Sequence, residues 1–105
     1  MTYPDLPTTI GKTGTSIMPP DGKIIKYVVK DEVRAFQNLR KDKVIVLQLM
    51  EFEDKRKEIR IGYYIIGKLP KMRGRWVWGQ FAAFMPISIF RQLIRKATKK
   101  GWPLV

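Results

Sequence analysis

Two stretches in the middle of the chain carry the apolar patterns of β-strands. Residues 44–52 are apolar in their first seven positions except at Gln48, which predicts a strand covered on both faces for much of its length. After a polar turn at 54–57, residues 58–66 alternate between two faces. One face would carry Ile59, Ile61, Tyr63 and Ile65, and the other would carry Arg60, Gly62, Tyr64 and Ile66.

A third apolar stretch at 75–84 predicts another strand, after a loop at 67–74. Short turns between successive strands require antiparallel pairing, so the three strands form a meander. The strand at 44–52 then needs a cover on its second face. A first helix predicted at 31–41, the N-terminal arm or another copy of the chain would provide it.

Apolar spacing predicts a helix on each side of the meander. At 31–41, Asp31 suits an N-cap, and Val33, Phe36 and Leu39 are spaced three apart. At 87–100, apolar side chains share one arc of the helical wheel and cations share the opposite arc, with Gly101 as the stop.

The predicted fold class is therefore α+β, with the order α-β-β-β-α in a single domain at 23–105. A short β-branched run at 23–30 adds an N-terminal edge strand to this scheme. Residues 1–22 hold four of the seven prolines and three of the eight glycines, which predicts a flexible arm.

Composition removes several classes of chemistry. The chain has no cysteine and no histidine, which excludes disulfides, thiolate catalysis and the commonest zinc ligands, so we expect no cofactor. No apolar run reaches the ~18 residues that a membrane span needs. The N-terminus lacks the basic start and apolar stretch of a signal peptide, so we expect a cytoplasmic protein.

Charge divides the chain into two unequal halves. The first 58 residues hold eleven cations and all nine acids, whereas the 47 residues after Glu58 hold ten cations and no acid. Of the formal net charge of +12, +10 therefore lies in the C-terminal part. A field of one sign is typical of a surface that attracts a charged ligand, so a polyanion such as DNA or RNA is the expected partner.

The strongest candidate site is the stretch from Lys68 to Trp78. Cations at four positions would neutralise phosphates, and Trp76, Trp78 and Tyr64 would stack on exposed bases. The cations are Lys68, Lys71, Arg73 and Arg75. The alternative interpretation is that Trp76 and Trp78 are core residues under the C-terminal helix.

The cationic arc of the C-terminal helix is a second candidate site. Its members are Arg91, Arg95, Lys96, Lys99 and Lys100. Such an arc would lie along a nucleic-acid backbone, or it would be a plain solvated face. No acid in this helix could form the i, i+4 pairs that solvated helices commonly use.

Two other functions remain open from the sequence. The basic face would dock an acidic protein while the apolar sheet forms a homodimer, which describes an interaction module. Alternatively, Asp42, Glu51 and Glu53 would hold a divalent metal in a nuclease. The pattern does not separate DNA from RNA, or single from double strands.

Overall fold

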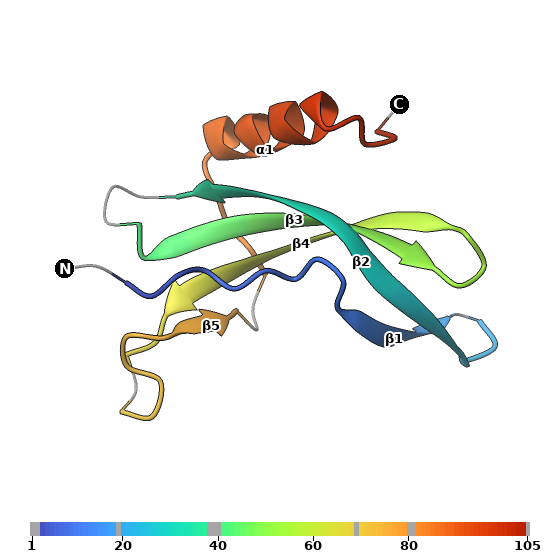
Figure 1. The fold of residues 1–105 in the computed structure, drawn as a ribbon, viewed down its shortest axis with the longest axis horizontal. Coiled ribbons are helices and arrows are strands. Elements are labelled where there is room, and N and C mark those ends of the chain that lie inside the picture. Colours follow the sequence, from blue (N-terminus) through green and yellow to red (C-terminus); the bar gives the residue numbers. More distant parts are fainter. Residues whose placement is uncertain (1–2, 19, 38–40, 69, 80–81, 105) are drawn as a thin grey trace.

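One antiparallel sheet and one helix make up the part of the protein that the structure describes. The computed structural model describes residues 3–18, 20–37, 41–68, 70–79 and 82–104. The strands lie in the sheet in their chain order and curl into an open half-barrel (Figure 1). The elements are β1 (Thr13–Met18), β2 (Lys23–Phe36), β3 (Lys43–Phe52), β4 (Lys57–Ile66), β5 (Trp76–Trp78) and α1 (Ile87–Lys99).

The helix packs on one side of the sheet, which we call the helix face. Leu93 and Ala97 of α1 are fully buried there, at 0% exposure, and Trp102 closes the end of the cluster. The sheet residues beneath them are Val33, Ala35, Ile45, Leu47 and Tyr63. Because α1 lies over β2, Ile59 and Ile61 on the helix face of β4 stay exposed.

The opposite side of the sheet, which we call the arm face, is crossed by residues 3–12. Val44 and Val46 of β3 pack there against Tyr64, with Leu6 of the N-terminal segment beside them. Figure 1 shows this segment running in front of the sheet. The prediction that β3 is covered on both faces is confirmed, with α1 over one face and the N-terminal segment over the other.

The predicted α-β-β-β-α order is wrong, because residues 31–36 belong to β2 and not to a helix. Val33 and Ala35 pack under α1, whereas Glu32, Arg34 and Phe36 lie on the arm face. A register shift between Val29 and Asp31 changes the alternation of faces, so no single period of two runs through β2. Leu39, which the helix prediction also used, lies outside the described residues.

The remaining predictions of elements have mixed outcomes. The strands at 44–52 and 58–66 and the C-terminal helix are confirmed within about one residue. The third strand is shorter than predicted, since β5 covers only Trp76–Trp78. Residues 1–22 contain a real strand, β1, which pairs with β2 and takes the edge position that was predicted for 23–30.

Candidate nucleic-acid interface

The loop between β4 and β5 presents four exposed cations from a closed backbone. Gly67 N donates to Arg75 O over 2.8 Å, and Gly74 N donates to Gly67 O over 3.2 Å. A Cβ at Gly67 would lie 2.3 Å from Met72 O, so glycine allows the loop to close this tightly. The backbone therefore fixes the base of a loop whose side chains at Lys68, Lys71, Arg73 and Arg75 are all exposed.

The aromatic residues predicted beside this loop lie on the arm face, so they are not under the helix. Trp76 is half-buried, and its Nε1 donates to Pro4 O over 2.8 Å. Trp78 is also half-buried and meets the ring of Tyr64 edge-on at 4.9 Å. Tyr64 itself is buried, and burial followed by the charge of Glu32 raises its pKa. Of the three predicted stacking residues, Trp78 and Trp76 therefore keep some exposed surface and Tyr64 keeps little.

The cations of α1 divide into anchored and open ones. Lys100 forms an ion pair of 2.7 Å with Asp31, and Lys96 donates to the carbonyl of Arg34. Among the described residues, no side-chain hydrogen bond or ion pair of Arg91, Arg95 or Lys99 is found. Three of the five predicted helix residues are thus left for a ligand.

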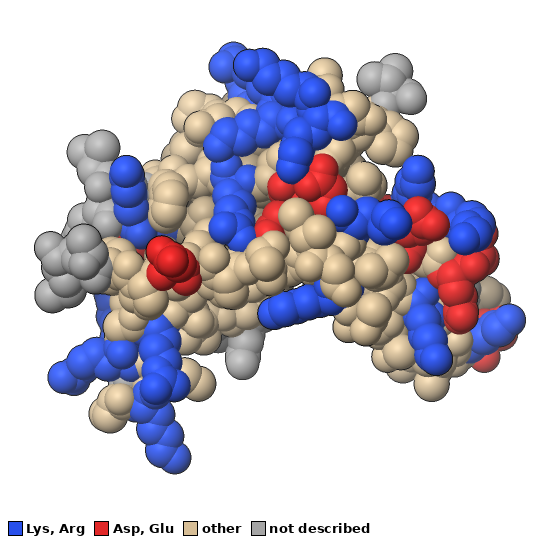
Figure 2. Space-filling view, viewed as in Figure 1, with Lys and Arg blue, Asp and Glu red and all other residues tan. Residues whose placement is uncertain are grey.

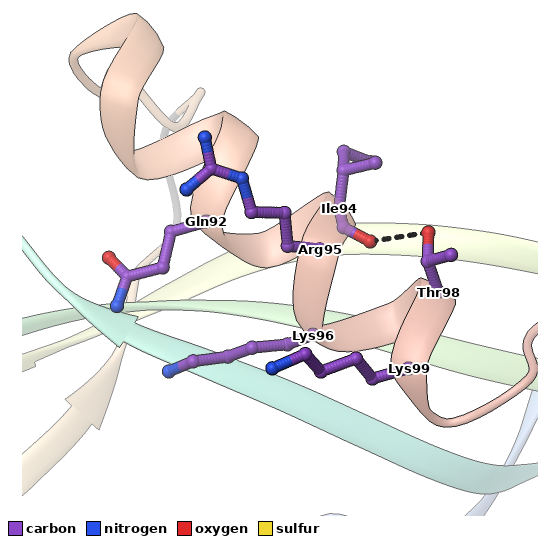
Figure 3. A pocket seen from close by; sticks show the side chains of 6 residues that line it. All are labelled: Gln92, Ile94, Arg95, Lys96, Thr98 and Lys99. Atoms are coloured by element: carbon purple, nitrogen blue, oxygen red, sulfur yellow. Dashed lines mark hydrogen bonds between the residues drawn. The ribbon is translucent and has the colours of Figure 1, made fainter.

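An open surface depression runs along α1 beside Arg95, Lys96 and Lys99 (Figure 3). Figure 3 shows Lys96 and Lys99 extending in the same direction, in front of β2, whereas Arg95 extends away from the sheet. The lining residues are Gln92, Ile94, Arg95, Lys96, Thr98 and Lys99. A neighbouring depression also includes Lys96 and Lys99 and reaches Arg34 of β2. The helix therefore offers a row of cations beside a hollow.

On the face drawn in Figure 2, the two predicted cation groups do not form one continuous patch. Figure 2 shows Lys and Arg gathered over α1 and again where the β4–β5 loop lies, with uncharged surface and an acidic group between them. Acidic side chains appear below α1 and at the end of the molecule that holds the β1–β2 and β3–β4 hairpins. On this face, a ligand that uses both groups must therefore cross the surface that separates them.

A further cluster on the arm face was missed by the sequence analysis, and we call it the Arg60 cluster: Arg60, Gln48, Tyr27 and Trp78. Arg60 Nε donates to Gln48 Oε1 over 2.7 Å, and its Nη1 donates to Tyr27 Oη over 3.2 Å. The guanidinium carbon lies 5.6 Å from the ring centroid of Tyr27 and 5.7 Å from that of Trp78. The sequence signal for this cluster was Gln48, the one polar residue within the apolar run, which is only 1% exposed.

Two neighbouring carboxylates of β2 bind the two ends of the chain. Burial alone would raise the pKa of Asp31, but hydrogen bonds from Lys100, Trp102 and the Glu32 N–H outweigh it and lower that pKa. Burial likewise opposes ionisation of Glu32, and hydrogen bonds from Thr8, Arg34 and Thr9 lower its pKa as well. Both carboxylates therefore act as structural anions, and neither is free to bind a ligand.

The carboxylates proposed for a metal-dependent nuclease do not converge. Asp42 precedes β3, whereas Glu51 and Glu53 lie at the other end of the same ten-residue strand. Ten strand residues span about 30 Å, which is far beyond the reach of one metal ion. Among the described residues, no group of three metal-binding side chains lies close enough to hold an ion. Within the same residues, no helix has the length and apolarity to cross a membrane.

Comparison of the chain with protein-family models, curated proteins and solved structures gave no significant match. Its function must therefore be inferred from its own residues.

Proposed function

We propose that this protein binds nucleic acid by contacts to the phosphate backbone, without covalent chemistry and in the cytoplasm. The observation that carries the proposal is the unopposed charge of the C-terminal part. Among the described residues, the ion pairs engage only Lys100 of the ten cations after Glu58. Unpaired Lys and Arg side chains on one polypeptide are what a regularly spaced series of phosphates requires.

The closed β4–β5 loop supports this function because it holds its cations before a ligand arrives. Restricting the backbone in advance lowers the entropy that binding must overcome. Arg73 and Arg75 lie directly at the backbone bonds that close the loop, so their Cα positions are fixed. The open cations of α1 would add contacts for a nucleic acid long enough to reach them.

The test is a titration of labelled DNA and RNA, single- and double-stranded, at 50 and 200 mM salt. With about five phosphates neutralised, the affinity should fall by roughly two to three orders of magnitude between these salt concentrations. The variant Arg73→Glu/Arg75→Glu should weaken binding to every sequence alike, because phosphate contacts carry no sequence information.

A control with the same change in net charge is Lys23→Glu/Lys26→Glu, which alters two exposed cations of β2. If the control weakens binding as much as the loop variant, the loop is not the binding site. A flat response to salt would overturn the proposal as a whole.

A second candidate function is a homodimer or an interaction module that docks an acidic partner. The observation in its favour is apolar surface on the helix side: Ile59 and Ile61 of β4 are 44% and 40% exposed, and Ile87 and Phe90 of α1 are 72% and 45% exposed. Exposed apolar side chains in such number often mark a contact with another protein. Sedimentation of the protein at several concentrations, together with failure to bind any oligonucleotide, would favour this function over the first.

A further inference from the structure

We propose that the Arg60 cluster binds one unpaired nucleotide, so that the preferred ligand is a single strand. This inference rests on the nucleic-acid binding proposed above and names the form of nucleic acid that is bound. The Arg60 cluster lies on the arm face, away from α1. Its four residues come from the four strands β2, β3, β4 and β5.

The buried amide of Gln48 is the first argument for a built site. A polar side chain in a strand interior is costly unless it is hydrogen-bonded, and an apolar residue would serve packing better. Gln48 and Arg60 are direct partners in the β3–β4 register, and the amide oxygen holds Arg60 Nε. The buried residue therefore fixes the orientation of an exposed guanidinium.

The donors of Arg60 are the second argument. A guanidinium has five N–H donors, and the bonds to Gln48 and Tyr27 use two of them. The remaining donors are available for a phosphate or for the acceptors on a base edge. A planar fork held in place suits both groups better than a flexible ammonium would.

The aromatic rings on both sides of Arg60 are the third argument. Tyr27 and Trp78 are both half-buried as residues, so neither is enclosed in the core. Because Gly62 has no side chain, the indole of Trp78 can pack directly on β4. A Cβ at position 62 would lie 2.2 Å from Trp78 Cζ2. Bases stack on aromatic rings supported in this way, and every base offers a π-face.

The combination of stacking rings and an oriented guanidinium selects an unpaired base. In a duplex the π-faces of the bases are occupied by their neighbours, so a duplex would offer this cluster only phosphates and base edges. A single strand can turn a base toward the sheet while its phosphates meet the loop cations. We therefore expect tighter binding of single strands than of duplexes.

The experiment compares two variants on strand β4 by anisotropy, with a single-stranded DNA of mixed sequence and the duplex formed from it. Arg60→Lys keeps the charge but loses the planar fork, and it should weaken single-strand binding about tenfold while weakening duplex binding clearly less, because only the single strand also stacks a base here. Lys57→Ala removes one charge from the exposed end of the same strand, on the other face, and should affect both ligands slightly and equally. Circular dichroism of both variants checks that the fold is kept.

Tryptophan fluorescence gives a second readout that does not depend on Arg60. Base stacking should quench the emission of Trp78, and Trp78→Phe should remove that part of the quenching. If Arg60→Lys binds the single strand like the wild type, or if the wild type prefers the duplex, the inference is wrong while nucleic-acid binding stands. If the wild-type protein binds no oligonucleotide, both proposals are wrong.

Discussion

The carboxylate of Asp31 accepts a hydrogen bond of 2.9 Å from the indole Nε1 of Trp102, a residue 71 positions later in the chain. The same carboxylate holds Lys100 at 2.7 Å. Trp102 is buried against the residues that α1 covers on β2 and β3, so this contact fixes the end of the helix to the sheet. An aspartate suited to a helix N-cap by its sequence position thus serves as an anchor between a strand and the C-terminal segment.

Asp31→Asn should lower the free energy of unfolding by about 1–3 kcal/mol. The neutral amide weakens two hydrogen bonds and leaves the Lys100 charge without its partner. Urea denaturation followed by fluorescence measures the change. Asp5→Asn is the matched control, because Asp5 is exposed and should change stability by less than about 0.5 kcal/mol. Equal stability of Asp31→Asn and wild type would show that the anchor contributes little.

Acid should destabilise the protein through Asp31 and Glu32. Their folded pKa values lie below the ordinary values of 3.8 and 4.5, so the unfolded chain binds protons more readily. The stabilising contribution is complete above the ordinary values, and it is lost as the pH falls from there through the folded pKa values. Thermal unfolding between pH 7 and pH 2 should show this loss, and Glu32→Gln should show a shallower decline. An identical acid profile for wild type and Glu32→Gln would contradict the assignment of Glu32.

Leu93→Ala should be among the most destabilising single changes in α1, at about 2–5 kcal/mol, because Leu93 is fully buried under the helix. Phe90→Ala removes a larger side chain from the same helix, but Phe90 is 45% exposed and its loss should cost clearly less. Chemical denaturation of both variants tests this order. The reverse order would mean that Phe90 is covered in solution, as the homodimer requires.

Gly67→Ala should weaken nucleic-acid binding without any change in charge. The new Cβ would meet Met72 O at 2.3 Å, so the loop backbone that carries Arg73 and Arg75 must open. An affinity loss of several-fold, with the salt dependence retained, is the expected result. Anisotropy titration measures it, with the melting temperature recorded to separate local opening from loss of the fold. Unchanged affinity would show that the closed loop is not needed for binding.

Gly62→Ala should destabilise the protein by about 1–3 kcal/mol through overpacking against Trp78. A double-mutant cycle with Trp78→Val separates this cause from the general effect of alanine in a strand. In the Trp78→Val background the substitution should cost little, because the indole that blocks the Cβ is gone. Equal costs in both backgrounds would contradict the packing of Trp78 on Gly62.

The elements that the sequence predicted well are those with one unbroken pattern. The apolar run of β3, the alternation of β4 and the two arcs of α1 each keep a single pattern from end to end. β2 does not, because the irregularity between Val29 and Asp31 moves the buried positions from one face to the other. The spacing of Val33 and Phe36 then matched a helix by coincidence, although these residues lie on opposite faces of a strand.

The site was predictable only where its residues are contiguous. The loop cations follow one another in the sequence, and the structure leaves all four exposed, as their types suggest. The Arg60 cluster draws its members from four strands, so it depends on the pairing of Gln48 with Arg60 and of Tyr64 with Trp78. β1 was missed for a related reason, since the Pro and Gly residues around it hid a short Thr-rich strand that pairs with β2.

The strand order β1 to β5 follows the chain, so each strand pairs only with its nearest neighbours in sequence and can do so during synthesis. The contact between Trp102 and Asp31 cannot form at that stage, because Trp102 leaves the ribosome after all five strands. The sheet of the nascent chain would therefore lack this contact until Trp102 has been synthesised. A fusion partner joined directly after Leu104 would obstruct the contact of Trp102 with Asp31, whereas one joined through a flexible spacer would leave that contact intact.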